Sequence, residues 1–385
     1  MYGATAATPA KSLLHAAARR LNTADPVGEM GYLIDESLPL PPGDGRYRRS
    51  RSFEPTFSES TPGNLGFTVA PGGPTAHAAE RVAEATDAAR RAVLRNFGPQ
   101  AERWLSGRAH AASEGEYRSA RWGAFLGTGF DRNGMSESSV AYEWGPWLTE
   151  SLPAPLFQLA QVAMDAAPAL RPAFSTIRCG RTTGSQQLTF EIESAMPLAD
   201  LKPLMDRLNL GDKHGGLMSA AALVLGARFT LPPSTAMLTL RPSQAGVELR
   251  LDVNLDALPD PPQALLPLLQ LQMAERPRSL RALDRWLTAM TPDGYGGPGE
   301  VSVLSIVVRP NMAARVAIYL RPALLDQPQP ANGGAPAATE PVAAQPQPVA
   351  APQPAVAPQP AVAPQPVAAA GVADPWSAAV LGAPR

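Results

Sequence analysis

Apolar and polar residues alternate strictly along several stretches of this chain. From 187 to 194 every second residue is apolar, and the polar residues between them include Thr189, Glu191 and Glu193. From 246 to 254 the same pattern leaves four polar residues on one face: Glu248, Arg250, Asp252 and Asn254. Alternation with a period of two predicts β-strands that bury one face and leave the other polar.

The predicted strands come in pairs, and the pairs recur about every 50 to 70 residues, which indicates a repeated architecture. The five pairs are 51–58 with 65–70, 122–130 with 139–144, 174–179 with 187–194, 236–240 with 246–254, and 301–309 with 315–322. Helices are expected between them at 75–97, 153–169, 197–208, 260–273 and 279–290. Asp260, followed by two prolines, is the expected N-cap of the fourth helix.

Ten antiparallel strands joined by hairpins form either an open sheet or a closed barrel. An open sheet covered by helices on one face would leave the polar face in bulk water. Closure removes both free edges and places the polar face around an interior that is wide enough for a ligand. We therefore expect an α+β fold, a ten-stranded antiparallel β-barrel with its helices outside, and keep the open sheet as the alternative.

Composition divides the chain into three parts. Residues 1–50 are expected to form a helical lead-in, and residues 51–325 the barrel domain. Residues 326–385 hold a Pro/Ala/Gln-rich repeat without aromatic residues or structural period, which predicts a disordered tail. The tail ends in DPWSAAVLGAPR, where Trp376 and Leu381 interrupt the repeat. This end is either a docking peptide for a protein partner or a frayed terminus.

Charge and residue counts exclude several classes of protein. Of 385 residues, 33 are basic and 34 acidic, whereas proteins that hold nucleic acid or anionic lipid carry a basic surplus. We therefore expect neither of those partners. One cysteine, Cys179, and four scattered histidines argue against a metal site. Without a long apolar run or a secretory signal, a cytoplasmic location is expected.

The C-terminal part of the predicted barrel resembles a known family. SLRALDRWLTAM at 279–290, GEVSVLSIVVRP at 299–310 and ARVAIYLRPALL at 314–325 look like the closing helix and last two strands of that family, and 319–322 matches its aromatic-x-x-Pro ending. Residues 122–144 resemble its second strand pair. The family is that of the aromatic prenyltransferases with the ABBA or PT-barrel fold, of the bacterial dimethylallyltryptophan-synthase type. The resemblance covers about 50–325.

The resemblance implies transfer of an allylic group from its diphosphate, such as dimethylallyl diphosphate, to an indole or phenol, with no metal and no further cofactor. The family's strands carry Lys-x-Tyr pairs that bind diphosphate and shield the allylic cation. Here Tyr142 and Tyr319 match tyrosines of that pattern, while Val140 stands at a lysine position and the middle pair reads Thr189 and Glu191. The family's acidic residue is expected near Asn64 or Leu65, neither of which is acidic. The diphosphate site is therefore expected to be divergent.

The candidate site residues follow from these positions. Arg250, Arg309 and Arg321 are expected to hold the diphosphate, since arginine binds phosphate bidentately. Tyr142 and Tyr319 complete that site. Glu191 and Glu193 are the candidate catalytic carboxylates, and Trp122 and Trp144 the candidate aromatic residues of the lumen. Arg315, Glu248 and Asp252 are further charged candidates.

Two alternatives stay open at this point. The charged residues of the lumen either serve chemistry or pair across neighbouring strands as an internal lattice, for example Glu191 with Arg250. The chain is either a prenyltransferase of secondary metabolism or a divergent barrel that binds a small ligand, serves as a scaffold or runs a different chemistry. The basic run RYRRSR at 46–51 is interpreted as a solvated loop.

Overall fold

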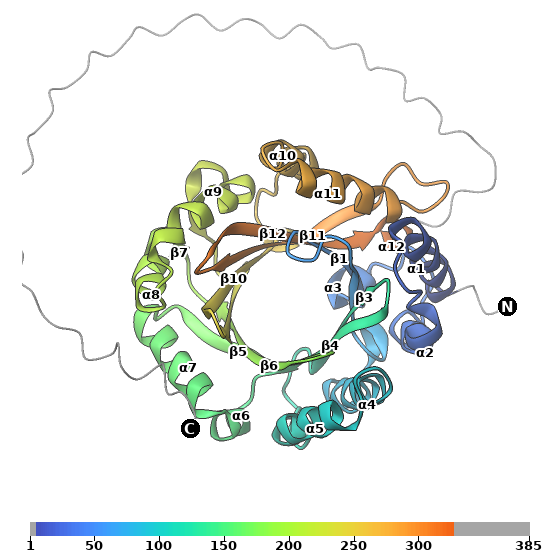
Figure 1. The fold of residues 1–385 in the computed structure, drawn as a ribbon, viewed down its shortest axis with the longest axis horizontal. Helices are drawn as coiled ribbons and strands as arrows, with labels where there is room; N and C mark the ends of the chain where they lie inside the picture. The colour runs from blue at the N-terminus through green and yellow to red at the C-terminus, as the bar shows by residue number, and fades with distance from the viewer. Residues whose placement is uncertain (1–4, 327–385) are drawn as a thin grey trace, which may run out of the picture. The chain divides into compact units, whose positions relative to one another are not determined.

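Ten strands of this chain form one closed antiparallel barrel in the order β1-β12-β11-β10-β9-β6-β5-β4-β3-β2 (Figure 1). The structure is a computed structural model that describes residues 5–326. The barrel strands are β1 (Phe53–Ser58), β2 (Leu65–Val69), β3 (Ala124–Asp131), β4 (Gly134–Glu143), β5 (Leu170–Gly180), β6 (Gly184–Ile192), β9 (Ala236–Ser243), β10 (Gly246–Asn254), β11 (Gly299–Arg309) and β12 (Met312–Pro322). The short strands β7 (Met196–Pro197) and β8 (Thr230–Leu231) pair separately.

Most of the helices lie in a ring around the barrel (Figure 1). They are α1 (Ala7–Leu21), α2 (Val27–Ser37), α3 (Arg46–Ser50), α4 (Ala78–Phe97), α5 (Pro99–Ser113), α6 (Pro146–Ser151), α7 (Ala154–Ala166), α8 (Lys202–Arg207), α9 (His214–Leu225), α10 (Leu265–Gln272), α11 (Pro277–Ala289) and α12 (Ala323–Asp326). Helix α3 differs, because Arg48 and Arg49 on this helix line the barrel cavity. The ring seals the outer face of the barrel from water.

The alternation of the strands correctly predicted closure. On β6 and β10 the apolar residues Leu188, Phe190, Leu249 and Leu251 are buried against the helices. The polar residues between them, such as Thr189 and Arg250, line the interior. The ten-stranded antiparallel barrel with external helices is thus confirmed, and the open sheet is wrong.

Two expected helices differ in detail, and α5 and α9 are the longest of the helices that were not expected. The segment 197–208 divides into a 3-10 turn, Leu198–Leu201, followed by α8. Helix α10 begins only at Leu265, so Asp260 is not its N-cap; the Asp260 side chain pairs with Arg228 at 3.2 Å. Helix α9 is almost uniformly apolar, and so shows no amphipathic period in the sequence. Helix α5 follows α4 directly, separated only by Gly98.

Within residues 5–326, no helix combines the length and the apolar character needed to cross a membrane. In the same residues, no group of three or more histidine, cysteine, aspartate or glutamate side chains lies where it could hold a metal ion. The predicted tail and its terminal docking peptide lie outside the described residues, apart from Asp326 at the end of α12.

The layer between strands and helices is a continuous apolar core that contains large aromatic side chains. Trp286 of α11 is fully buried and packs on Phe57 of β1, with ring centroids 5.9 Å apart. Phe67 and Phe130 stack on neighbouring strands at 6.2 Å. Burial of such rings away from water stabilises the attachment of the helices to the barrel.

Trp286→Ala should lower the free energy of unfolding by about 3–5 kcal/mol, because it opens a cavity between α11 and β1. Leu271→Ala is the matched control: Leu271 on neighbouring α10 is 73% exposed. Its truncation should change the same quantity by no more than about 0.5 kcal/mol. Chemical denaturation of both variants measures the difference. Equal effects would contradict the position of Trp286 in the core.

Candidate active site in the barrel lumen

The barrel encloses a cavity of about 910 Å³ that is lined by residues of all ten barrel strands. This volume lies at the upper end of the range typical of small-molecule sites. Polar and charged residues of the inner face line it, together with the arginines of α3 and the segment before β3. The cavity is therefore the first candidate for a functional site.

The charges on the cavity wall are balanced. The arginines that line it are Arg48, Arg49, Arg51, Arg121, Arg178, Arg250 and Arg309. The carboxylates that line it are Glu54, Glu137, Glu143, Glu191, Glu248, Asp252 and Asp256. No lysine stands among these lining residues, and Tyr319 is their one tyrosine. The wall therefore carries as many arginines as carboxylates and little of the Lys-x-Tyr pattern.

Ion pairs occupy the end of the lumen at which β10 begins and β11 ends. Glu248 accepts hydrogen bonds from Arg241, at 2.7 Å, and from Arg309. Burial disfavours the Glu248 carboxylate, but the two guanidinium groups outweigh that effect and hold its pKa below its usual range. Arg178 pairs with Glu137 in the same way. The lattice that the sequence left open is present at this end.

A third carboxylate completes this end of the barrel. Glu59, after β1, pairs with Arg276 at 2.9 Å and Arg315 at 3.3 Å. It also accepts the backbone N–H of Val316 at 2.9 Å. Arg315 is thus bound to Glu59 and does not line the cavity.

The centre of the lumen is built by Arg250, Asp252 and Tyr319. Arg250 pairs with Asp252 at 2.9 Å, and Asp252 also accepts a hydrogen bond from Ser305. The pair of Glu191 with Arg250, the example given for an internal lattice, does not form. Burial raises the pKa of Tyr319, so its hydroxyl stays protonated and available as a hydrogen-bond donor.

Three cavity carboxylates form no ion pair with an arginine among the described residues: Glu54, Glu143 and Glu191. Glu143 instead accepts backbone N–H groups of residues 121–123. Glu54 on β1 is 6% exposed and accepts a hydrogen bond from the Ser302 hydroxyl at 2.6 Å. Ser302 lies at a register shift of β11, between Val301 and Val303, which turns its side chain towards β1. Glu191 on β6 lines the cavity without a hydrogen bond to any described residue.

Sequence reasoning missed Glu54. It placed the acidic residue of the first strand pair near Asn64 or Leu65, beyond the turn that follows β1. The signal available was that Glu54, Thr56 and Ser58 share one face of β1, the face that lines the cavity.

Sequence reasoning also missed the arginines of RYRRSR. Instead of a solvated loop, these residues form α3, and Arg48, Arg49 and Arg51 line the mouth of the cavity. Arg121 lines the same cavity just before β3, and its guanidinium lies 4.5 Å from the ring centroid of Trp122.

Tyr142 does not line the cavity, contrary to expectation. On β4 the residues Glu137, Ser139, Ala141 and Glu143 face inward, so Tyr142 faces the helices. Its hydroxyl lies 3.0 Å from that of Thr86 on α4, and burial raises its pKa to about 12. Because side chains on a strand alternate with a period of two, Tyr142 points to the same face as Val140, which is fully buried.

Glu193 and Arg321 also stand off the cavity wall. Glu193 follows the end of β6, is exposed and pairs with Arg171 at 3.0 Å. Arg321 is 4% exposed and is surrounded by three carboxylates: Asp256 at 2.7 Å, Asp326 at 2.9 Å and Glu300. Arg321 is therefore already neutralised where it lies.

Trp122 and Trp144 both line the cavity, as expected. Trp122 also begins a series of rings along the wall. Its ring centroid lies 6.0 Å from that of Phe125, which in turn lies 6.0 Å from that of Phe174. All three rings line the cavity. This aromatic ladder, Trp122–Phe125–Phe174, gives one side of the lumen an apolar surface with π faces.

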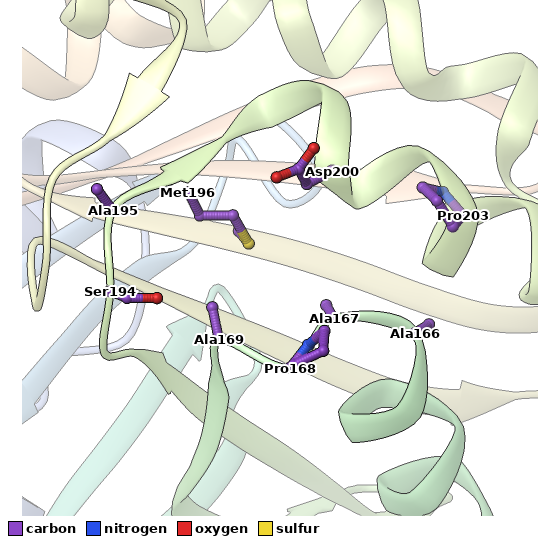
Figure 2. Close-up of a pocket in the computed structure, with 9 residues that line it drawn as sticks. All are labelled: Ala166, Ala167, Pro168, Ala169, Ser194, Ala195, Met196, Asp200 and Pro203. Carbon is purple, nitrogen blue, oxygen red and sulfur yellow. The ribbon is translucent and has the colours of Figure 1, made fainter.

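A smaller pocket of about 380 Å³ lies outside the barrel, between the end of α7 and the segment that leads into α8 (Figure 2). Alanine and proline make up most of its wall, and Asp200 is the only charged residue among those lining it. It offers far less chemistry than the lumen.

Glu248 is expected to make the free energy of unfolding depend on pH in the acidic range. Because its folded pKa lies below the ordinary value of about 4.3, its contribution is present above that pH and is lost as pH falls towards the folded pKa. Glu248→Gln should therefore flatten the loss of stability below about pH 4.3. Denaturant titrations from pH 3 to 7 measure it, with the exposed Glu275→Gln as control. An unchanged acid slope would contradict the pair with Arg241 and Arg309.

No protein-family model and no curated protein sequence matches this chain, but solved structures do. One is the 5-dimethylallyltryptophan synthase from Streptomyces coelicolor, at TM-score 0.62 and 15% identity over 84% of this chain and 99% of that one. Another is the 6-dimethylallyltryptophan synthase from Micromonospora olivasterospora in complex with DMASPP and Trp, at TM-score 0.63 and 15% identity over 83% and 97%. A third is PriB in complex with product diphosphate, at TM-score 0.62 and 15% identity over 86% and 99%.

These likenesses extend over nearly the whole length of each solved structure. Identities of 15% support a statement about architecture, and function needs its own argument from the site. Together with the closed ring of ten strands, they establish that this chain has the PT-barrel fold of the aromatic prenyltransferases.

Proposed function

We propose that this chain transfers an allylic group from its diphosphate to an aromatic acceptor inside the barrel. The observation that supports it most is the cavity of the barrel, in which Glu54, a buried carboxylate without an arginine partner among residues 5–326, lies on the wall with the aromatic ladder. The fold supports the proposal by analogy.

The reaction breaks the bond between the allylic carbon and the diphosphate oxygen, and the electron pair leaves with the diphosphate. The resulting allylic cation is attacked by a carbon of the electron-rich acceptor ring, which forms a carbon–carbon bond. The ring then loses a proton to a base. The site must therefore neutralise a diphosphate, stabilise a cation away from water and accept one proton.

Glu54 is the proposed proton acceptor. Its low exposure and its bond from Ser302 fix the carboxylate in one orientation, as a general base requires. Glu191, the candidate expected from the sequence, lines the same cavity on β6 and is the second carboxylate to test. Tyr319 and the aromatic ladder would surround the cation.

The substrates are inferred from the relatives. Structures similar to this one contain DMASPP and Trp, a diphosphate analogue and an indole. We infer an indole or phenol acceptor and an allylic diphosphate such as dimethylallyl diphosphate, without a metal or a further cofactor. A cytoplasmic location and a protein partner for the tail remain predictions from the sequence.

The competing function is a barrel that binds a small ligand without prenyl transfer. The observation that favours it is the commitment of Arg178 and Arg309 to carboxylates, together with the absence of lysine from the lining residues. Incubation with dimethylallyl diphosphate and a panel of indoles and phenols separates the two. Binding of acceptors without product would favour the binding protein.

Glu54→Gln should lower kcat by about 10²- to 10⁴-fold, the usual contribution of a general base. The variants Glu191→Gln and Glu193→Gln test, in the same assay, the two carboxylates that the sequence analysis favoured. The matched control is the exposed Glu275→Gln. Product formation under saturating substrates measures all four. An unaltered kcat in Glu54→Gln would exclude Glu54 as the base.

A further inference from the structure

The position of the diphosphate is the open question within the proposed function, on which the following inference rests. The arginines on the strands are engaged: Arg250 with Asp252, Arg309 with Glu248 and Arg178 with Glu137. An anion that approached any of them would also approach the paired carboxylate, and the like charges would repel. A trianionic or dianionic group needs guanidinium groups that are not neutralised.

Such guanidinium groups stand together at one mouth of the barrel. Arg49, Arg51 and Arg121 line the cavity, and none has a carboxylate within ion-pair distance among residues 5–326. Arg48, which lies beside them, forms an ion pair with Asp256 at 3.2 Å. The rim arginines, Arg49, Arg51 and Arg121, are thus the unpaired cations of the wall.

Sheet topology brings these three residues close together. Arg49 and Arg51 directly precede β1, and Arg121 directly precedes β3. Both strands pair antiparallel with β2, so they run in the same direction and begin at the same mouth. Two strand spacings amount to about 10 Å, a gap that two arginine side chains bridge with a diphosphate between them.

The backbone conformation at this mouth is a second observation in favour of a ligand site. Arg51 adopts a left-handed conformation, with φ of 49°, as the C-cap of α3. Glycine adopts this conformation without steric cost, whereas a side chain is strained there. A long charged side chain at a glycine position, on a cavity wall and without an ion-pair partner among residues 5–326, points to a ligand.

The segment that carries Arg121 is held rigidly. The Glu143 carboxylate accepts the backbone N–H groups of Arg121 at 2.9 Å and of Gly123 at 2.7 Å, and also that of Trp122. A Cβ at Gly123 would lie 2.3 Å from the carbonyl oxygen of Ala78, so only glycine fits this close approach. Trp122 below the Arg121 guanidinium restricts it further. The site is preorganised on this side.

The aromatic ladder continues from Arg121 along the wall, beginning at Trp122. We propose that the rim arginines bind the diphosphate of the allylic substrate and that its hydrocarbon chain lies along Trp122, Phe125 and Phe174. The anionic head of such a substrate matches the arginines at the mouth, and its apolar chain matches the aromatic rings that follow them along the wall.

Binding of inorganic pyrophosphate to the full chain tests the proposal by calorimetry. Arg51→Gly should weaken binding about 10- to 100-fold, the effect of one charge-assisted contact, while the thermal midpoint stays equal or rises because strain is relieved. Arg49→Ala and Arg121→Ala should weaken binding similarly. Arg46→Ala is the matched control, since Arg46 lies on the same helix but pairs with Asp44 at 2.8 Å.

Arg309→Gln tests the rival position on the strands. If Arg309→Gln abolishes pyrophosphate binding and the rim variants retain it, the rim site is wrong while prenyl transfer stands. In turnover, the rim variants should raise the KM for the allylic diphosphate and leave that for the acceptor unchanged; the reverse would overturn the proposal. Absence of both pyrophosphate binding and product in the unaltered chain would overturn the proposed function itself.

Discussion

Compensation of charge within a closed lumen is the constraint on which this structure depends. The ten strands close completely, and helices seal their outer face, so charged side chains on the inner face share one confined space. An uncompensated charge in such a space is costly. The wall accordingly holds equal numbers of arginines and carboxylates, and one carboxylate, Glu248, is shared by two arginines.

The groups left out of this compensation are those to which we assign the proposed chemistry. Glu54 is oriented by a serine rather than an arginine, and among the described residues no carboxylate lies within ion-pair distance of the rim arginine side chains. They lie at one mouth, since β1 and β3 begin there. Ion pairs at the opposite end stabilise the barrel, whereas the unpaired groups at this mouth remain available to a substrate.

The sequence predicted the fold well because apolar and polar residues alternate within each strand, and closing the strands into a barrel keeps the two faces of each strand distinct. Each strand pair appeared within a few residues of its place. The inward direction expected for Tyr142 is wrong. The family resemblance placed this side chain in the lumen, but residues two positions apart on a strand share a face, and Val140 is apolar. Glu54 and the arginines of α3 were missed because their significance depends on which strand ends meet, and that is a property of the closed barrel.

A neutral lumen suits an allylic cation if the diphosphate is bound at its edge. In a strongly basic lumen the cations that bind the leaving group also repel the cation that remains. Here the carboxylates Glu54 and Glu191 and the rings of the ladder face the interior, and the unpaired guanidinium groups lie at the mouth. Carboxylates and π faces stabilise positive charge, and guanidinium groups stabilise the departing anion. In the proposed arrangement the anion site lies at the mouth of the barrel, where released diphosphate has a direct exit to solvent.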